Sequence, residues 1–544
     1  MLPTNTVTLA VYLGVLPTIW YLWKKAYSLY TSPLLHLPGP HSPNKFYGHV
    51  RQMCSPTSGP ITLQWLEDYG PTICTSWLFQ LPSLWTADPT ALTRILTSSK
   101  YIKPWEARMS AAQVIGNSVL IMEGEAHRNQ RRILNPAFSP GQIRELTACM
   151  VHKALQLRKY WEAQLNGMDD WVTLNAADGL KKVTLDIIGL AGFGYDLEAL
   201  SLDGKPNELC EAFGHIFGTA PPVSILRLFM AFVPQLDFFP DERTIKINEA
   251  METMRRIGLQ LIREKREAIL AESSGKGSGS VGKHDVEGRD LLSLLIKANM
   301  ASDLPDEQRL SEEEVLSQIP TFLIAGHETT SSSVSWCLFA LTQAPAALAT
   351  LRAELLAVPT DAPTMDELAA LPYLDQVVRE TMRLHTPMTF TLRVPTEDDV
   401  IPVGTPYTDR RGVVRHEIHI MKGNRIVIPV LALHRSKAVW GDDALEFRPE
   451  RWQNPPEGLA ASIPGVWSNQ LAFLGGPRAC IGYRFALTEM KAILFTIVRG
   501  FEFELAVPAE EIVPVGLMTR RTAVKSEAKK GAQLPLRMRP YRRT

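Results

Sequence analysis

The chain has 544 residues, of which 45% are hydrophobic and 21% charged, with 57 Lys and Arg against 57 Asp and Glu. This is the composition of a folded globular protein, and it excludes a wholly disordered chain. The balanced charge argues against a general nucleic-acid binder, which would carry a basic excess. Six cysteines without a CxxC pair exclude a disulfide scaffold and a zinc ribbon and indicate a reducing compartment.

An uncharged, apolar stretch, residues 7–23, lies near the beginning of the chain. Its length is at the lower limit of what spans a bilayer. Three of its last four residues are aromatic, and Lys24 and Lys25 follow it, as at a membrane interface. Because no small-residue cleavage site follows, a retained anchor over residues 1–25 is favoured over a cleaved signal peptide, with a buried core helix as the alternative. The positive-inside rule then places the remaining chain in the cytosol.

The next segment, 26–45, is rich in proline, with Pro38, Pro40 and Pro43 close together. Proline interrupts helices and favours an extended chain, so we expect a stiff linker. The remaining residues, 46–544, form the predicted main body of the protein.

Within the body, hydrophobic periodicity predicts mostly helices and a few strands. Two apolar, β-branched runs, 72–79 and 83–87, predict a hairpin, and 417–430 carries two short strand signals. Long helices are expected over 141–165, 176–192, 246–272 and 347–357. The low-complexity run 273–283 predicts a surface loop inserted between two helices. The fold class is therefore mainly α with small β-sheets.

A particularly long helix is expected in the middle of the chain. Ser311 and Glu314 have the spacing of a capping box, which marks the start of a helix that should end near Thr342. Pro320 should either kink this helix or delay its true start. The hexapeptide AGHETT, residues 325–330, lies midway along it.

Residues 473–482, FLGGPRACIG, place a single cysteine, Cys480, among glycines. Glycines let a backbone approach a flat ligand closely. A helix is predicted over 483–497, and its N-terminal dipole, together with the amides of the two residues after Cys480, would stabilise a thiolate. Arg478 would meet an anionic group of the same ligand. The residues thus predict a thiolate presented to a metal or an electrophile; the alternative is an ordinary buried cysteine.

The same stretch matches the pattern F-x-x-G-x-R-x-C-x-G and resembles the haem-binding loop of the cytochrome P450 family. Further motifs of that family follow in its order, and the resemblance extends over essentially the whole chain after the anchor. It implies the cytochrome P450 fold, with one large catalytic domain behind an N-terminal transmembrane helix. It also implies haem b, with Cys480 as the axial thiolate ligand of the iron and Phe473 and Arg478 as further cofactor-binding residues.

Glu380 and Arg383 form Glu-x-x-Arg in a helical stretch, 373–385, where a spacing of three brings both side chains to one face. The resemblance gives Arg451, within FRPERW, as the third member of a buried structural network that fixes the core around the haem loop. Alternatively, Glu380 and Arg383 form a solvated surface pair.

The hexapeptide 325–330 resembles the family's A/G-G-x-D/E-T-T signature. Ala325 and Gly326 are small enough to admit a flat ligand and oxygen. Thr329 can turn its hydroxyl away from the helix ladder and open a groove for water, and Glu328 can connect that water to solvent protons. We therefore expect Glu328 and Thr329 to be the catalytic pair that manages protons. In the alternative interpretation, Thr329 bonds back to its own packed helix and Glu328 is a surface acid.

Residues 124–132 resemble the family's W-x-x-x-R helix, whose aromatic residue and arginine hold haem propionates. His127 takes the tryptophan position and Arg131 the arginine position. Arg393 resembles another propionate ligand, so Arg131, Arg393 and Arg478 would together offset the two propionate charges. Each of them alone also fits an ordinary surface arginine.

The resemblance implies a monooxygenase that inserts one oxygen atom from O2 into a lipophilic small molecule. Electrons would come from NADPH through a separate NADPH-cytochrome P450 reductase, because no nucleotide-binding motif opens a helix in this chain. The expected location is the endoplasmic reticulum membrane, with a single span and a cytosolic catalytic domain. Two alternatives remain. One is a haem-thiolate isomerase or dehydratase that uses no external O2, a type that tends to lose the acid–threonine pair; the other is an inactive haem-binding protein.

A strongly apolar stretch, residues 213–239, should by family position form the roof of the substrate pocket and an access lip near the membrane. The other lining residues expected from the resemblance are Trp105, Met109, Ile115, Met388, Phe390, Leu392, Leu517 and Met518. A lining with almost no charge indicates a lipophilic substrate that enters from the bilayer. The chain looks similar to fungal members of secondary metabolism, for instance those acting on terpenoids. Alternatively, each of these hydrophobic residues belongs to the core.

Overall fold

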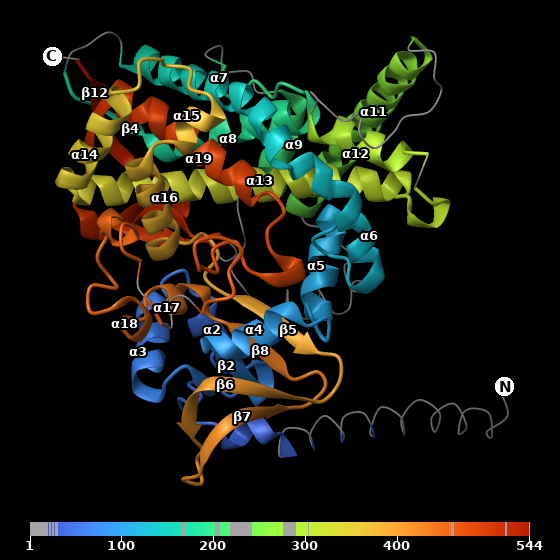
Figure 1. Ribbon diagram of the computed structural model, residues 1–544, viewed down its shortest axis with the longest axis vertical. Coiled ribbons are helices and arrows are strands. Elements are labelled where there is room, and N and C mark those ends of the chain that lie inside the picture. The colour runs from blue at the N-terminus through green and yellow to red at the C-terminus, as the bar shows by residue number, and fades with distance from the viewer. Residues whose placement is uncertain are drawn as a thin grey trace.

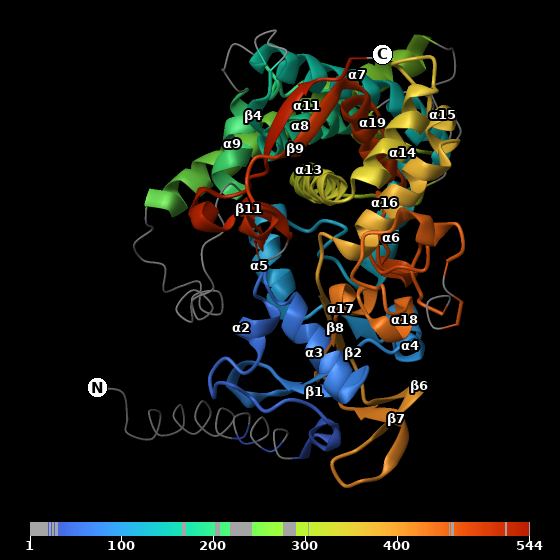
Figure 2. The same cartoon turned by 90° about the vertical axis from the view of Figure 1, so that its left-hand side faces the viewer.

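The computed structural model describes residues 20, 23, 27 and 31–542, except 166–169, 202–206, 218–241, 276–289, 303, 456, 459–461 and 517–518. A layer of helices lies above a part that carries the largest sheet (Figure 1). Between them, the long helix α13 (Glu312–Gln343) crosses the molecule. Seen along its axis, α13 is surrounded by other elements (Figure 2).

Helix α13 is long because both its start and its surroundings favour it. The Ser311 side chain accepts from the Glu314 amide while the Glu314 carboxylate accepts from the Ser311 amide, which is the predicted capping box. The helix begins at Glu312, so the expected delay by Pro320 is wrong. Proline removes one backbone donor, but Ile319 and Thr321 on either side of it are buried, and this packing keeps the helix continuous.

The four long helices expected from periodicity are present. They are α7 (Pro140–Gln164), α8 (Ala176–Phe193), α11 (Glu242–Gly275) and α14 (Pro345–Leu356). The helix expected after Cys480 is α19 (Tyr483–Gly500). Helix α8 packs along α13 and α19 packs along α7, so the helical layer is built around the buried faces of these four.

The other α-helices of the described chain have 4 to 13 residues. They are α2 (Val50–Met53), α3 (Gly59–Tyr69), α4 (Pro89–Thr97), α5 (Trp105–Ile115), α6 (Gly124–Leu134), α9 (Glu208–Phe217), α12 (Leu291–Met300), α15 (Met365–Ala369), α16 (Pro372–Leu384), α17 (Val430–His434) and α18 (Lys437–Trp440).

The largest sheet combines strands from distant parts of the chain in the order β1-β2-β8-β5-β3. Its strands are β1 (Thr72–Ser76), β2 (Pro82–Thr86), β8 (Arg425–Ile428), β5 (Thr391–Pro395) and β3 (Tyr101–Ile102). The predicted hairpin is the antiparallel pair β1 and β2, in which Cys74 lies opposite Leu84. Strand β8 then runs parallel to β2 and antiparallel to β5.

Three smaller sheets complete the β-structure of the described residues. Strand β6 (Asp399–Thr408) pairs with β7 (Val414–Ile420), so the two strand signals in 417–430 belong to different sheets. The others are β4 (Val172–Asn175) with β12 (Pro535–Pro540) and β9 (Phe501–Leu505), and β10 (Ile512–Val515) with β11 (Arg521–Val524). A mainly α fold with small sheets is thus confirmed.

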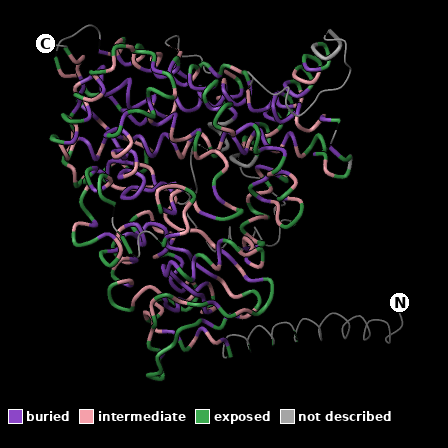
Figure 3. The backbone as a smooth tube through the Cα atoms, in the orientation of Figure 1, coloured by how far each residue is buried: buried purple, intermediate pink, exposed green. Residues whose placement is uncertain are grey.

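Two hydrophobic clusters form the core. One lies among the helices, and the other lies around the largest sheet; buried backbone follows both (Figure 3). Leu34 and Leu37, from the proline-rich segment 26–45, belong to the sheet cluster and are 0% and 2% exposed. The Pro38 carbonyl accepts the Cys74 amide, so this part of the segment is fixed to strand β1.

The predicted anchor, residues 1–25, falls outside the described residues except at Trp20 and Trp23, which are exposed. Across the ranges that the structure describes, no single helix combines the length and the apolar character needed to cross a bilayer. Helices α13 and α14 meet that test only together, across a bend of 114°.

Candidate active site

Cys480 lies in a tight loop directly before α19. Its amide donates to the Phe473 carbonyl over 2.8 Å, which closes the loop. The Cys480 side chain is exposed by area, yet burial by the surrounding protein raises the pKa of its thiol. The Gly482 amide and the Arg131 charge act in the opposite direction and lower that pKa. The sulfur therefore has an open face, and its protonation is set by burial, which favours the neutral thiol, against the Gly482 amide and Arg131, which favour the thiolate.

Two of the loop glycines are required because other backbone segments of the protein approach them closely. Gly476 has φ +68°, and an added Cβ would lie 2.1 Å from the Leu96 carbonyl oxygen. At Gly475 a Cβ would lie 1.6 Å from the Pro464 oxygen. These two positions thus require glycine for packing, a different reason from the expected approach of a flat ligand. At Gly482 a Cβ would meet Phe138 at 3.5 Å, an ordinary contact.

Phe473, whose carbonyl closes the loop, is 7% exposed. Its ring lies 5.6 Å from Trp467 and 6.0 Å from Tyr483, in edge and tilted arrangements. Such aromatic contacts stabilise the loop beyond the burial of area alone.

Four cationic or titratable residues predicted to hold an anionic ligand lie around this loop. Arg131, on α6, donates from Nη1 to the Ala479 carbonyl over 2.5 Å. Arg478 donates to the Met122 carbonyl over 2.6 Å and pairs with Glu123. Burial, with Arg108 nearby, lowers the pKa of Arg478 to about 10.

Arg393, on β5, is 1% exposed. Its Nη1 donates to the Leu392 carbonyl over 2.7 Å and to the Thr391 hydroxyl over 3.1 Å, while its Nη2 is buried without a hydrogen bond. His127 is also buried, and burial, with Arg131 and Lys103 nearby, lowers its pKa to about 4. The imidazole is therefore neutral at pH 7 and keeps one N–H donor.

Two further cations of this group, Lys103 and Arg108, are not predicted by the sequence. Lys103 donates to the Leu120 carbonyl over 2.6 Å, and burial, together with Arg478, Arg393 and Arg108, lowers its pKa to about 7. Arg108, on α5, has a buried Nε without a hydrogen bond. Neither belongs to a spaced motif, so only their position beside the arginines identifies them. The group therefore carries more positive charges than the single carboxylate of Glu123 can balance.

Helix α13 contributes the predicted proton-handling residues. Ala325 is exposed, and the half-buried Thr329 donates its hydroxyl to the Ala325 carbonyl over 2.6 Å. The hydroxyl thus bonds back to its own helix, as in the alternative interpretation, and does not turn away from the ladder. Such a bond competes with the regular ladder and often bends a helix. Glu328 Oε1 lies 3.4 Å from Nη1 of Arg521, and burial raises the pKa of Glu328. An added Cβ at Gly326 would lie 3.0 Å from Ile188, so its small size serves the packing of α13 on α8.

An aromatic pair connects α13 with the cysteine loop. The Phe138 ring, which a Cβ at Gly482 would meet at 3.5 Å, lies edge-to-face with Phe322 of α13 at 5.6 Å. Phe138 thus lies between α13 and the residue that precedes α19.

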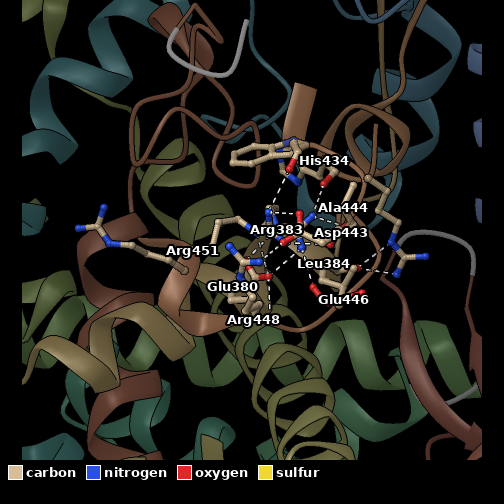
Figure 4. A network of polar contacts seen from close by, with 12 residues as sticks. Glu380, Arg383, Leu384, His434, Asp443, Ala444, Glu446, Arg448 and Arg451 are labelled. Carbon is tan, nitrogen blue, oxygen red and sulfur yellow. Dashed lines mark hydrogen bonds and ion pairs between the residues drawn. The ribbon is translucent and has the colours of Figure 1, made fainter. Parts of the chain in front are cut away.

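Glu380 and Arg383 form a completely buried bidentate pair, with Nη2–Oε1 2.8 Å and Nε–Oε2 2.9 Å (Figure 4). Arg451 donates to Glu380 Oε1 over 3.4 Å and to Asp443 over 2.6 Å. The Trp452 indole also donates to Glu380, over 3.0 Å. The three predicted network residues are thus in contact, and Asp443 and Trp452 are additional members that their spacing did not reveal.

This network reaches the cysteine loop through His434. Arg383 Nη1 donates to the His434 carbonyl over 2.8 Å, and the His434 ring Nε2 accepts the Leu471 amide over 2.8 Å. Burial lowers the pKa of His434 to about 3, so the ring is neutral and able to accept. The network therefore positions the chain two residues before Phe473.

Of the residues expected to line a substrate pocket, Trp105 and Met109 on α5 are exposed and Ile115 is buried. Met388, Phe390 and Leu392 are half-buried. Leu517 and Met518 and most of the apolar stretch 213–239 lie outside the described residues.

The comparison with known proteins decides the family. The family model described as Cytochrome P450 matches residues 38–522. The chain belongs to the cytochrome P450 family. Cytochrome P450 monooxygenase 205 of Postia placenta is 48% identical over 542 residues, which cover 99% of both chains. Cytochrome P450 monooxygenase 128 of the same fungus is 47% identical, with 93% of each chain covered. Cytochrome P450 monooxygenase claQ of Ampulloclitocybe clavipes is 34% identical, with 92% of each covered.

This P450 is therefore a monooxygenase enzyme whose cofactor is haem with a cysteine thiolate ligand. The described residues fit that group. The thiol of Cys480 has an open face, and Arg393 has a buried donor with no protein acceptor. The surplus of cations around Arg478 suits the two carboxylates of a haem.

Proposed function

We propose that this P450 inserts one oxygen atom from O2 into a lipophilic small molecule, such as a terpenoid of secondary metabolism. Its electrons come from NADPH through a separate NADPH-cytochrome P450 reductase. The observation that carries the proposal is the combination of Cys480, flanked by cations, with an intact Glu328–Thr329 pair on α13, the helix that contacts α19 directly after the cysteine loop.

In this proposal Cys480 is the iron ligand, and Arg131, Arg393, Arg478 and His127 hold the propionates, with Lys103 as a further partner. A haem with a thiolate ligand supplies the activation of oxygen when it is bound. Arg131 and the Gly482 amide stabilise the thiolate, because both lower the pKa of Cys480. The Thr329 hydroxyl and the Glu328 carboxyl hold and move protons at the same helix turn.

A lipophilic substrate is supported by the side chains at the expected pocket. Met388, Phe390 and Leu392, next to Arg393, are half-buried and apolar, and Trp105 and Met109 expose further apolar surface on α5. Pockets of this composition favour apolar ligands and use a few polar groups for orientation. An isomerase or dehydratase that uses no O2 has less support, because Glu328 and Thr329 are retained.

We further propose a single-pass anchor, residues 1–25, in the endoplasmic reticulum membrane, with the catalytic body in the cytosol. Support comes from the apolar stretch 7–23 and from Lys24 and Lys25 after it. Deletion of residues 1–25 is expected to release the protein from microsomal membranes in a sedimentation assay. Tight retention of the shortened protein would assign the attachment to another surface.

The function is tested in microsomes that contain this P450 and an NADPH-cytochrome P450 reductase. Terpenoids, steroids, fatty acids and polyketides are first screened for substrate-induced shifts of the haem spectrum. For each compound that binds, 18O2 is supplied, and one labelled oxygen atom in the product with one NADPH consumed is expected. Product formed without NADPH and without label would favour the isomerase or dehydratase. The matched control is Cys480→Ser in the same membranes.

A further inference from the structure

Two arginines beside the segment that leads to Arg393 carry positive charge inside the protein. Arg520, directly before β11, is 9% exposed, and its Nε and Nη1 are buried without a hydrogen bond. Arg435, directly after α17, is half-buried by area. In the part of the chain that the structure describes, no carboxylate acts on the charge of either guanidinium. A buried charge is costly unless an opposite charge offsets it.

The cost of these two charges is visible in their protonation. Burial lowers the pKa of Arg520 to about 10, and it lowers the pKa of Arg435 well below its usual range. Arg520 and Arg383 add to the lowering at Arg435. Arg383 is already paired with Glu380 at 2.8 Å, so the uncompensated charge belongs to Arg435 and Arg520. An anion between these two would relieve their mutual repulsion.

Both arginines are fastened to the end of α16 and the turn that follows it. The Nε and Nη2 of Arg435 donate to the Leu384 carbonyl over 2.9 and 2.5 Å, and these two bonds do not use its Nη1. The Arg520 amide donates to the Pro387 carbonyl over 2.9 Å, and its own carbonyl accepts the Trp336 indole N–H over 2.6 Å. The fold therefore holds both residues in place, next to the segment 388–392 that is expected to line the substrate pocket.

Aromatic rings surround the Arg520 side chain. Its guanidinium lies over the Trp336 ring, 4.7 Å from the centroid, and Trp336 stacks on His385 with 5.0 Å between the ring centroids. The His385 Nδ1 is buried without a hydrogen bond. Burial, together with Arg435 and Arg520, lowers the pKa of His385 well below its usual value, so the ring is neutral and does not balance the arginines.

Arg435 also reaches the wall of a small pocket. Ser58, Phe390 and Leu431 are among the residues that line this pocket. A Cβ at Gly59 would lie 3.4 Å from Nη1 of Arg435 and 3.6 Å from Cδ2 of Leu431. Gly59 is the first residue of α3, which lies beside α17 (Figure 2), and Ser58 makes no side-chain cap bond there. The partial positive charge of this helix end adds to that of Arg435.

We propose that Arg435 and Arg520 bind the carboxylate of a lipophilic substrate, so that this P450 acts on acids whose apolar part lies along the half-buried Met388 and Phe390. The donors are Nε and Nη1 of Arg520 and Nη1 of Arg435, and these three nitrogens match the two oxygens of a carboxylate. The bound acid offsets one of the two charges and fixes the direction in which the substrate lies. This inference rests on the proposed function, because it takes the anion to be part of the molecule that is oxidised.

The test measures ligand binding to the haem-loaded protein without NADPH. Farnesoic acid and methyl farnesoate form a matched pair that differs in the negative charge, and dodecanoic acid and methyl dodecanoate form a second pair. Equilibrium dialysis gives each dissociation constant. The unaltered protein is expected to bind each acid about 10-fold or more tightly than its ester, as for a hydrogen bond to a charged group. Arg520→Gln is expected to remove this preference, and Arg520→Lys, which keeps the charge but loses the fork, should keep part of it.

Arg537→Gln is the matched control, because Arg537 forms a half-exposed pair with Glu504 at 2.8 Å on a distant strand; it should keep the full preference for the acids. If Arg520→Gln does not fold, the ratio of acid to ester binding in Arg520→Lys and Arg435→Lys provides the comparison. An unchanged preference in the variants overturns the proposal.

Two further measurements separate this site from a site for a free anion and from the proposed function. Equal binding of acid and ester by the unaltered protein, together with acetate binding that Arg520→Gln removes, would assign the site to a free anion and overturn its role toward substrate. Equal binding of acid and ester, with both oxidised in the presence of reductase, NADPH and O2, rejects the site and leaves the proposed function intact. A preference for acids that depends on Arg520, in a protein that never oxidises any bound compound, supports the carboxylate site and rejects the proposed function.

Discussion

Arg131 and Ala479 are joined by a hydrogen bond of 2.5 Å, from the guanidinium Nη1 to the carbonyl of the residue before Cys480. One side chain of α6 thus binds the cysteine loop directly and also lowers the pKa of the cysteine thiol. Burial lowers the pKa of Arg131 itself, whereas the nearby Cys480 raises it. The positive charge of Arg131 therefore has a desolvation cost, which an anion beside it offsets.

Replacing Arg131 with Leu is expected to lower the haem content of the purified protein, because it removes both the loop contact and a charge for a propionate. Haem per polypeptide is measured from the pigment spectrum. Arg128→Leu is the matched control, since Arg128 lies on the same helix and is exposed. Equal haem content in the two variants would contradict a role for Arg131 in holding the cofactor.

Cys480→Ser is expected to abolish the long-wavelength Soret band of the reduced carbon-monoxide complex, because a serine oxygen does not replace the thiolate. The difference spectrum of reduced protein with and without carbon monoxide measures it. Cys210→Ser, at a half-buried cysteine, should keep the band. An unchanged band in Cys480→Ser would reject the ligand assignment.

Thr329→Ala should retain haem but divert electrons to peroxide, because the hydroxyl bonded to the Ala325 carbonyl is lost from the proton-handling turn. Product per NADPH is expected to fall by about 100-fold, the lower range for loss of an acid–base group. Product and hydrogen peroxide are measured in the same reaction. Thr329→Ser, which keeps the hydroxyl, should form nearly as much product per NADPH as the unaltered enzyme. If Thr329→Ala also forms one product for each NADPH, Thr329 has no role in proton handling.

Glu380→Gln is expected to lower the free energy of unfolding by about 3–5 kcal/mol, because it leaves two buried arginines without their shared carboxylate. Denaturant unfolding of both proteins gives the difference. Glu504→Gln breaks the half-exposed pair with Arg537 and should cost at most about 1 kcal/mol. A small effect at Glu380 would mean that the network is replaceable by neutral hydrogen bonds.

Acid should destabilise the fold through its buried histidines. In the folded protein the pKa of His434 and His327 is about 3 and that of His127 about 4, below the usual value near 6.5 of an unfolded chain. The stabilisation is complete above pH 6.5 and is lost as the pH falls toward 3, because the unfolded chain binds these protons first. Each histidine contributes a slope of about 1.4 kcal/mol per pH unit.

The check on this prediction is the free energy of unfolding measured across that pH range. His434→Gln should flatten the dependence, whereas the exposed His419→Gln should leave it as it is. A stability that stays level from pH 6.5 to 4 would show that the three rings titrate normally.

Features with a fixed local spacing were accessible from the sequence. The capping box at Ser311, the Glu380–Arg383 pair and the loop around Cys480 each depend on residues a few positions apart, where helix and turn geometry alone determine the contact. The long helices could be predicted for the same reason, although their ends differ by a few residues.

Contacts between distant segments were not accessible in this way. Lys103 joins the propionate cations, and Arg521 pairs with Glu328, only because the fold brings separate elements together. The reason that a position requires glycine also depends on its neighbours. A Cβ at Gly326 would lie 3.0 Å from Ile188 of α8, which no local pattern indicates. Pro320 shows the reverse case. Proline disfavours the interior of a helix, but the buried residues around it keep α13 continuous.

The central position of β8 in the largest sheet has a consequence for biosynthesis. The hairpin of residues 72–86 acquires its parallel partner only when residues 425–428 have left the ribosome. Until then its inner edge offers unpaired amides and carbonyls to other nascent chains. Expression yield should therefore respond to chaperone supply during the late part of translation, and fragments that end before residue 425 should accumulate as aggregates.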